Sequence, residues 1–259
     1  YRQDGEVKVN RPFAKEELNA LPTPDFDGLP LDLYLSPERV LPVMGSRGCY
    51  WEKCAFCSIP FDHMTFHVRY AENVVNDFKN LQEKYNCNNF FFTDEALPIN
   101  FLRTFAAKII EQKVDVQWTG ELKFEKSLLK DDRMDLLYKS GCRKLIFGLE
   151  SYNQRVLDSM KKGVELSWVD ETAERCIKLG IAMHFYLICG FPTETREEVM
   201  DSINFVLNNQ RLLDSPGFSA ILSQFDLERG APIENNPMEW GITKLYTPPE
   251  HDLSLGYSY

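Results

Sequence analysis

Three cysteines lie within nine residues of one another in the segment SRGCYWEKCAFCSIP (46–60). Cys49, Cys54 and Cys57 supply three soft sulfur donors from a single loop, and no fourth cysteine lies nearby. Three thiolates suit an iron–sulfur cluster that keeps one iron open. Because an open iron can bind a ligand of its own, the loop predicts a metal centre at which chemistry takes place.

The same loop is compatible with two other metal sites. His63 follows shortly after Cys57, and three cysteines with one histidine form a tetrahedral site for structural zinc. Such a chain would be a zinc-stabilised binding module without catalysis. In a third interpretation, His63 or His67 completes a four-ligand cluster in an electron-transfer protein. Colour and metal content separate these alternatives.

Charged residues that can bind a ligand follow several short apolar runs. The candidates are Asp94, Glu95, Glu121, Lys123, Glu150 and Lys162. Carboxylates accept hydrogen bonds from hydroxyl groups, and an ammonium group is a partner for a carboxylate. Barrel sites are built at the carboxyl ends of parallel strands. We therefore expect these side chains to lie at the same end of the fold as the cysteine loop.

From Val40 onward, the chain alternates between short apolar runs and helical patterns. The runs predict six strands, at residues 40–46, 89–93, 114–119, 144–150, 181–190 and 218–225. Between them, apolar residues recur three or four positions apart, which predicts helices. Strands that alternate with helices form a parallel sheet with right-handed crossovers. We therefore expect an α/β fold, namely a partial (β/α)6 TIM-like barrel of parallel strands.

Several residues predict where helices begin and end. Asp131 is expected to cap the third helix. The fourth helical pattern, 168–179, stops at Gly180. Thr195 and Glu198 form a capping-box pair at the start of the last helix.

The composition predicts three segments. Residues 1–39 form a Pro-rich connector, residues 40–236 form the barrel, and residues 237–259 form a tail or the start of a missing domain. A complete eight-unit barrel would need two further units, for which residues 237–259 offer no pattern. A doubly wound open sheet is the competing fold, but no G-x-G-x-x-G follows a first strand.

The charge balance narrows the classes of partner. The chain has 29 Lys and Arg against 39 Asp and Glu, a formal net charge of −10, so its overall field does not steer it to nucleic acid. No apolar run approaches the ~18–20 residues that span a bilayer. No signal peptide is recognisable before Arg11, and we expect a cytoplasmic protein without a membrane partner.

The remaining cysteines are scattered singly through apolar sequence. A tight cysteine cluster in a chain without an export signal indicates metal binding rather than disulfides. We expect the scattered ones to be small buried hydrophobes, and they are Cys87, Cys142, Cys176 and Cys189.

The cysteine segment resembles the signature of the radical S-adenosylmethionine (SAM) superfamily. That signature is usually C-x3-C-x2-C with an aromatic residue before the last cysteine. Here it reads C-x4-C-x2-C, one residue longer in the first gap, and Phe56 is the aromatic residue. The resemblance implies a [4Fe–4S] cluster on Cys49, Cys54 and Cys57, with Phe56 near the adenine of SAM.

Two further segments resemble the same superfamily. TDEAL (93–97) stands where the family contacts the methionine amino group, which assigns Asp94 and Glu95 to SAM binding although glycines are usual there. GLESYNQRVLDSMKKG (148–163) resembles the segment whose strand ends on a polar residue for the ribose hydroxyls. A basic residue twelve positions later meets the methionine carboxylate. The residues in these places are Glu150, with Ser151 beside it, and Lys162.

The fifth strand and the end of the third supply further candidates. LICGFPTET (187–195) resembles the fifth-strand turn of the family, which implies that Ile188 lies against the adenine. Strand alternation then points His184 and Tyr186 into the barrel and Cys189 towards the helices. Glu121, at the end of the third strand, is assigned to cofactor binding. No acid, base or hydrogen-atom donor stands out as catalytic.

The resemblance implies an enzyme that reductively cleaves SAM to a 5′-deoxyadenosyl radical and uses it to modify a substrate. The electron would come from a flavodoxin or ferredoxin-type donor, and the substrate would be a small molecule or peptide. The segments 24–38 and 46–49 resemble the subgroup whose core follows a cobalamin-binding domain. That subgroup implies a cobalamin-linked methyltransferase or a natural-product-modifying enzyme. A methylthiotransferase would need three more grouped cysteines, and residues 1–39 contain none.

Overall fold

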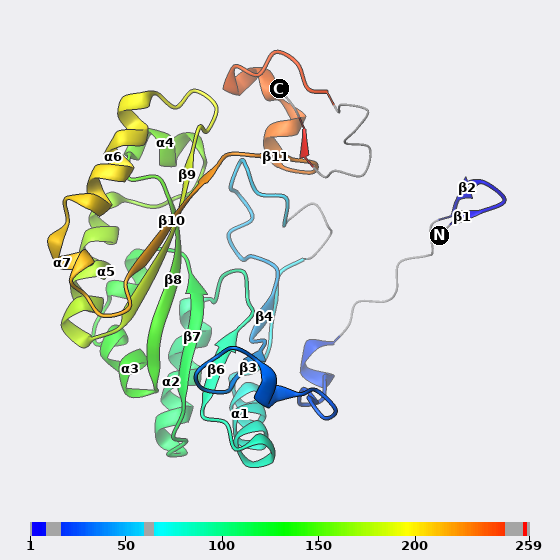
Figure 1. The fold of residues 1–259 in the computed structure, drawn as a ribbon, viewed down its shortest axis with the longest axis vertical. Coiled ribbons are helices and arrows are strands. Elements are labelled where there is room, and N and C mark those ends of the chain that lie inside the picture. Colours follow the sequence, from blue (N-terminus) through cyan, green and yellow to red (C-terminus); the bar gives the residue numbers. More distant parts are fainter. Residues whose placement is uncertain (1, 9–16, 60–64, 247–255, 258–259) are drawn as a thin grey trace.

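The computed structural model describes residues 2–8, 17–59, 65–246 and 256–257 (Figure 1). Its strands are β1 (Arg2–Gln3), β2 (Glu6–Val7), β3 (Val40–Val43), β4 (Ser46–Arg47), β5 (His67–Val68), β6 (Asn89–Phe92), β7 (Gln117–Leu122), β8 (Cys142–Glu150), β9 (Ala182–Cys189), β10 (Ser219–Gln224), β11 (Leu227–Glu228) and β12 (Gly256–Tyr257). Its α-helices are α1 (Ala71–Tyr85), α2 (Ile99–Glu111), α3 (Arg133–Lys139), α4 (Gln154–Ser159), α5 (Leu166–Leu179), α6 (Arg196–Leu207) and α7 (Gln210–Leu213). Short 3-10 helices cover Leu18–Ala20, Leu31–Leu33, Lys126–Leu129, Pro232–Asn235 and Pro237–Trp240.

Six parallel strands form the central sheet, in the order β10-β9-β8-β7-β6-β3. Consecutive strands of this sheet are neighbours in space, and a helix lies between most of them in the chain. The order is that of six units of a TIM-like barrel laid side by side, with β3 and β10 at the two edges. The predicted partial (β/α)6 barrel of parallel strands is confirmed.

One face of the sheet is buried under the helices (Figure 1). Residues on this face alternate with more exposed ones along β3, β6, β7 and β9. Aromatic rings dominate the packing, and Phe92 contacts Phe105 and Trp118 edge-on at centroid distances of 5.3 and 5.7 Å. Since each buried aromatic side chain contributes roughly 2–3 kcal/mol, this layer fixes the positions of the strands.

The opposite face of the sheet is open in the described part of the chain. Register partners in a parallel sheet point to the same side, and here Glu121, Ile146, His184 and Ser219 form one row across four strands. Tyr186, two residues beyond His184, is 39% exposed. His184 and Tyr186 therefore lie on the inner face of the partial barrel, as predicted.

Most predicted helix ends agree with the structure. Gly180 ends α5 with φ of +73°, and Thr195 with Glu198 forms the capping box of α6. The third helix differs, because Asp132 rather than Asp131 is its N-cap residue and Asp131 has a left-handed φ of +54°. In that conformation Asp131 belongs to the preceding turn.

The third strand lies further along the chain than predicted. β7 covers Gln117–Leu122 instead of residues 114–119. The N–H groups of Lys113 and Val114 bond back to the end of α2, at the carbonyls of Ile110 and Ile109. The chain is still turning there, so strand pairing starts later and carries Glu121 into the strand.

A second, smaller core lies at the carboxyl ends of the strands. It joins Ala55 of the cysteine segment to Phe191, Phe225, Ile233 and Trp240. Residues 225–242 therefore pack onto the cysteine segment (Figure 1). Residues 247–255 of the predicted tail lie outside the described residues, and the predicted division at residues 39 and 236 stays a prediction.

No helix among the described residues has the length and apolar character to cross a bilayer. Cys87, Cys142 and Cys176 are buried, as predicted. Cys189 is only half-buried, because β9 ends there.

Candidate functional site

The cysteine loop (residues 48–59) is held at both sides by the backbone of one residue. Ala55 is fully buried, its N–H donates to the carbonyl of Met160 at 2.8 Å, and its carbonyl accepts from the N–H of Ile233 at 2.9 Å. The first bond ties the loop to the segment between α4 and α5, which carries Lys162. The second ties it to the C-terminal segment. The thiols therefore lie between these two walls.

Trp51, inside the longer first gap, is a second anchor of the loop. Its indole Nε1 donates to the carbonyl of Lys161 at 2.9 Å. Its ring lies against Gly163, where an added Cβ would come within 2.1 Å of the indole. The Lys123 ammonium lies 4.1 Å from the ring centroid and donates to the Gly163 carbonyl at 2.5 Å. These contacts hold Trp51, and with it the longer first gap of the cysteine loop, beside Lys162.

The three cysteine side chains are half-buried and act on one another electrostatically. Burial raises the pKa of Cys54 to about 11, and the nearby Lys162 ammonium opposes that rise. Burial also raises the pKa of Cys57. Thiols with raised pKa values are protonated at neutral pH, so metal binding here must release protons.

Glu150 and Lys162 form a buried ion pair beside the cysteine loop. Lys162 Nζ donates to Glu150 Oε1 at 2.6 Å, and the side chains of Lys162 and Glu150 are 11% and 9% exposed respectively. Burial by itself lowers the pKa of Lys162, but the Glu150 carboxylate and the Cys54 thiol outweigh it and raise the pKa above its usual value. The pair thus places the Lys162 ammonium near the thiols, and the Glu150 carboxylate partly offsets its effect on Cys54 and Cys57.

The backbone around Glu150 is shaped for this pair. Glu150 ends β8 with a left-handed φ of +66°, next to an irregularity in the pairing with β9. A left-handed glutamate costs on the order of 1 kcal/mol or more, and such strain gathers at functional sites. At Gly148, an added Cβ would lie 2.4 Å from Glu150 Oε1 and 2.8 Å from Lys162 Nζ. Any side chain here would displace the ends of Glu150 and Lys162, so the glycine leaves space for the ion pair in this position.

Two more carboxylates extend the site along the strand ends. Burial raises the pKa of Glu121, the Tyr186 hydroxyl lowers it by donating at 3.5 Å, and the Glu95 and Glu150 carboxylates raise it. Glu95 Oε2 in turn accepts from the N–H of Gly48 at 3.1 Å. The structure therefore brings Glu95, Glu121 and Glu150 to one region beside the cysteine loop.

Phe56 and Ile188 border the same region. Both are partly buried and pack against the second core. The Phe56 ring lies 5.7 Å from Lys162 Nζ. Phe56 and Ile188, which are both predicted to lie near the adenine, thus belong to one apolar cluster at the carboxyl ends of the strands.

Two predicted residues have their polar groups directed elsewhere. The carboxylate of Asp94, 2% exposed, accepts from the N–H of Gly45 at 3.0 Å and from the Ser46 hydroxyl at 2.6 Å. Burial raises the pKa of Asp94 to about 6. The buried Ser151 hydroxyl faces that of Ser202 on α6 at 3.3 Å. Asp94 shapes the turn before the cysteine loop, and Ser151 packs against a helix, so direct roles in ligand binding stay predictions.

The sequence did not predict Trp51, Ala55 or Gly148 as contributors to the site. Their importance comes from contacts with residues elsewhere in the chain, such as Lys161 and Ile233. The one available signal was Trp51 itself, a large aromatic residue placed where the cysteine spacing is longer than usual.

No three His, Cys, Asp or Glu side chains among the described residues form a ready-made site for a single metal ion. His63, proposed as a zinc ligand, lies outside those residues. His67 is in β5, paired with Arg47. The chemistry of the donors nevertheless fits an iron–sulfur cluster, since three neighbouring thiols share a half-buried loop with a cation beside them.

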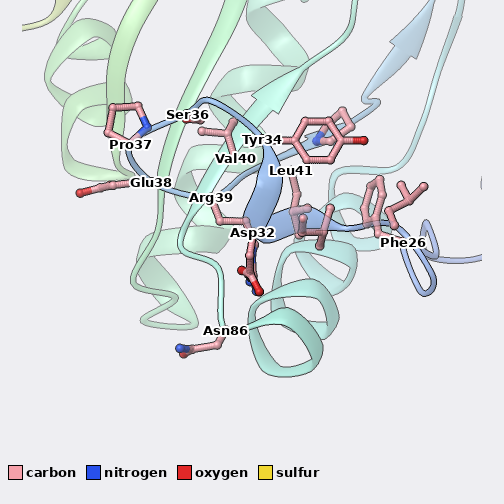
Figure 2. Close-up of a pocket in the computed structure, with 13 residues that line it drawn as sticks. Phe26, Asp32, Tyr34, Ser36, Pro37, Glu38, Arg39, Val40, Leu41 and Asn86 are labelled. Atoms are coloured by element: carbon pink, nitrogen blue, oxygen red, sulfur yellow. Dashed lines mark hydrogen bonds and ion pairs between the residues drawn. The ribbon is translucent and has the colours of Figure 1, made fainter.

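A cavity of the described structure lies elsewhere (Figure 2). It has a volume of about 520 Å³ and is lined by residues of the connector and the first residues of β3, including Tyr34, Arg39 and Val40. Arg39 pairs with Asp32, which also lines the cavity, at 2.5 Å. This cavity is at the amino end of β3, whereas the cysteine loop follows its carboxyl end, so it is no part of the candidate site.

Comparison with known proteins gives a family model, described as the radical SAM superfamily, that matches residues 43–206. An uncharacterised methyltransferase of Pyrococcus horikoshii is 29% identical over 215 residues, which are 79% of this chain and 45% of the relative. Bacteriochlorophyllide d C-12(1)-methyltransferase of Chlorobaculum tepidum is 25% identical over 71% of this chain and 40% of its own length. The chain thus spans less than half the length of these relatives.

Solved structures show the same fold. The radical SAM methyltransferase TsrM of Kitasatospora setae, with cobalamin and a [4Fe–4S] cluster bound, superposes with a TM-score of 0.64 at 17% identity, covering 82% of this chain and 43% of TsrM. The cobalamin-dependent SAM radical enzyme OxsB, in its apo form, gives a TM-score of 0.71 at 16% identity over 98% of this chain and 42% of OxsB.

Proposed function

Because the chain belongs to the radical SAM superfamily, we propose that it binds a [4Fe–4S] cluster on Cys49, Cys54 and Cys57 and cleaves SAM reductively to a 5′-deoxyadenosyl radical that modifies a substrate. One observation carries the proposal. The cysteine loop is bonded directly to the segment that holds Lys162, through the contact of Ala55 with Met160. A cluster and a cationic anchor for an amino-acid carboxylate would then share one site.

Different residues of the site bind different groups of SAM. Lys162 carries the charge that faces the methionine carboxylate, and Glu150 accepts hydrogen bonds from ribose hydroxyls. In the structure these two satisfy each other at 2.6 Å, so binding SAM exchanges or shares an existing ion pair. Glu121 interacts electrostatically with that pair and with Glu95, and these two carboxylates are available to the methionine amino group.

The apolar side of the site orients SAM and excludes water. Phe56 and Ile188 border the second core and offer a surface for the adenine. A bound cluster supplies one-electron reduction of the SAM sulfonium, and a flavodoxin or ferredoxin-type protein would deliver that electron. The open inner face of the sheet then receives the substrate, because it continues directly from Glu121 and Tyr186.

The test is anaerobic reconstitution with iron and sulfide, followed by assay of 5′-deoxyadenosine with SAM and dithionite. The wild-type protein is expected to turn brown and to form the nucleoside. Cys54→Ala should lose both properties, whereas Cys87→Ala, in which a buried thiol far from the loop is removed, should keep them. A colourless protein that retains stoichiometric zinc would establish the binding-module alternative instead.

Within the superfamily, we propose a cobalamin-linked methyltransferase. The support is the set of similar proteins, since two relatives are named methyltransferases and TsrM is a methyltransferase with cobalamin bound. The cobalamin would be held by a domain outside this sequence. The test is co-purification of the complete protein with hydroxocobalamin, where a bound cobalamin spectrum supports the subclass and a protein that never retains cobalamin contradicts it.

A further inference from the structure

Lys144 lies on the open inner face of the sheet, away from the cysteine loop. Lys144 is the third residue of β8 and pairs with Thr119 of β7 and Ala182 of β9, neither of which is charged. Among the described residues, its ammonium group forms no hydrogen bond and no ion pair. The residue is half-buried, and in a chain with a net charge of −10 such a lysine usually has an acidic partner.

A histidine and a serine lie next to Lys144 on the same face. His184 follows Ala182 by two residues and therefore points to the same side of the sheet, one row further along. His184 Nδ1 and Ser219 Oγ are 2.7 Å apart. Burial lowers the pKa of His184, and the charge of Lys144 lowers it further, which places the two groups in each other's field.

The imidazole of His184 is held in a defined orientation. Tyr186 contacts it edge-on at a centroid distance of 4.8 Å, and the Tyr186 hydroxyl donates to Glu121 at 3.5 Å. When the Ser219 hydroxyl donates to Nδ1, the proton of the neutral ring is on Nε2. His184 then presents an N–H donor, and Lys144 presents an ammonium, from neighbouring positions of one surface.

The inner face therefore carries charges of opposite sign at its two ends. Glu95, Glu121 and Glu150 gather at the carboxyl ends of the strands, beside Lys162. Lys144 and His184 lie towards the amino ends. A substrate between these regions would meet positive donors at the end remote from the cysteine loop.

We propose that Lys144 and His184, with Ser219 behind the imidazole, bind an anionic oxygen group of the substrate, a carboxylate or a phosphate. This inference rests on the proposed function only in taking the open face as the substrate side. Charge-assisted hydrogen bonds from an ammonium and an imidazole N–H are stronger than neutral ones and suit both groups. The site selects substrates that carry such a group and places their other end towards Glu121.

The experiment uses protein without iron, so that it does not depend on SAM cleavage. Imidazole resonances are followed by NMR at pH 7.5 while inorganic phosphate, or in a separate arm acetate, replaces chloride at constant ionic strength. The His184 signals, assigned with His184→Gln, are expected to shift saturably, with a dissociation constant in the millimolar range. A response to only one anion identifies which of the two groups the site binds.

Variants of Lys144 decide the interpretation. Lys144→Gln should weaken binding about tenfold or more, because the charge-assisted hydrogen bond is lost. Lys144→Arg keeps the charge and should restore binding, which guards against a variant that is merely misfolded. Lys139→Gln, at an exposed position on α3, is the matched control. No saturable shift with either anion, or an equal shift in Lys144→Gln, would overturn the proposal.

The two proposals fail in different ways. If wild-type protein forms 5′-deoxyadenosine but neither anion shifts His184, the anion site is wrong and the radical SAM assignment stands. If the anions bind but no nucleoside forms, the site exists without the proposed reaction.

Discussion

Two buried ion pairs in this chain are alike in geometry and differ in their surroundings. Arg69 and Asp77 are joined at 2.7 Å, Lys162 and Glu150 at 2.6 Å, and all four side chains are at most 11% exposed. Asp77 also accepts from the Thr23 hydroxyl at 2.7 Å. Among the described residues, the Glu150 carboxylate has no hydrogen-bond partner besides Lys162.

The difference separates a structural pair from one that can accept a ligand. Arg69 also donates to the carbonyl of Met44 at 3.0 Å, so its pair ties α1 to the segment before the cysteine loop. The pair of Lys162 and Glu150 lies at the rim of an open face, and Glu150 keeps unused acceptor capacity. The burial of the two ion pairs and the distances within them do not distinguish their roles. The further hydrogen-bond partners of each pair do.

The largest effect is expected from breaking the structural pair. Asp77→Asn leaves the Arg69 charge buried without a counter-charge and should lower the free energy of unfolding by about 3–5 kcal/mol. Glu150→Gln should cost less than half as much, because Glu150 and Lys162 are about twice as exposed as Asp77 and Arg69. Urea denaturation of both variants measures the difference, and equal losses would remove the distinction between the pairs.

Lys123 is a third buried cation, and it contacts no carboxylate among the described residues. It therefore extends the comparison to a buried charge that has no paired counter-charge. Burial lowers its pKa to about 8, below the value of about 10.4 in the unfolded chain. Between these pH values the unfolded chain binds more protons, so wild-type stability should rise with pH, by on the order of 2–3 kcal/mol. Below pH 8 both states are protonated and this contribution is constant.

Lys123→Met removes the titrating group. The unfolding free energy of wild type should therefore rise relative to that of the variant as pH increases from 7.5 to 10.5. A difference that stays constant over the whole range would show that Lys123 keeps an ordinary pKa in the folded protein.

The space for the second pair is tested at Gly148. In Gly148→Ala the new methyl group would collide with Glu150 and Lys162. We expect SAM to bind about tenfold more weakly to the reconstituted variant, which corresponds to about 1.4 kcal/mol. The control is Gly120→Ala, where the methyl group would meet Leu97 at 2.5 Å within the core. That variant should be less stable but keep its SAM affinity, as measured by equilibrium dialysis without reductant.

The smallest effect is expected at Trp51. Trp51→Phe keeps an aromatic ring against Gly163 but loses the hydrogen bond to the Lys161 carbonyl. The unfolding free energy should fall by roughly 0.5–1.5 kcal/mol. Trp51→Ala, which also removes the ring, should cost clearly more. If the two variants behave alike, the ring contributes nothing to holding the loop.

The fold was predictable because its signals are local. The capping box of Thr195 and Glu198 and the stop at Gly180 depend on residues a few positions apart, and both were predicted. The start of β7 was wrong because the hydrogen bonds of Lys113 and Val114 to α2 are invisible in an apolar pattern.

The site was predictable only where a side chain acts at a strand end. Glu150 and Lys162 could be assigned from their spacing, and the structure brings them together. Asp94 looks the same in sequence, but its carboxylate bonds to Gly45 and Ser46, because the strand before it brings it beneath that turn. The contribution of Ala55 could not be predicted, since alanine carries no functional group and acts through its backbone.

The two backbone bonds of Ala55 have a consequence for how the protein is made. The chain leaves the ribosome amino terminus first, so the cysteine loop emerges long before Ile233, whose N–H donates to the Ala55 carbonyl of the loop. At roughly 5–20 residues per second, the delay is on the order of ten seconds or more. During that interval the three thiols are on an unfinished surface, open to oxidants and to metals other than iron. A cluster bound to these thiols as proposed would therefore have its complete surroundings only after Ile233 has been synthesised.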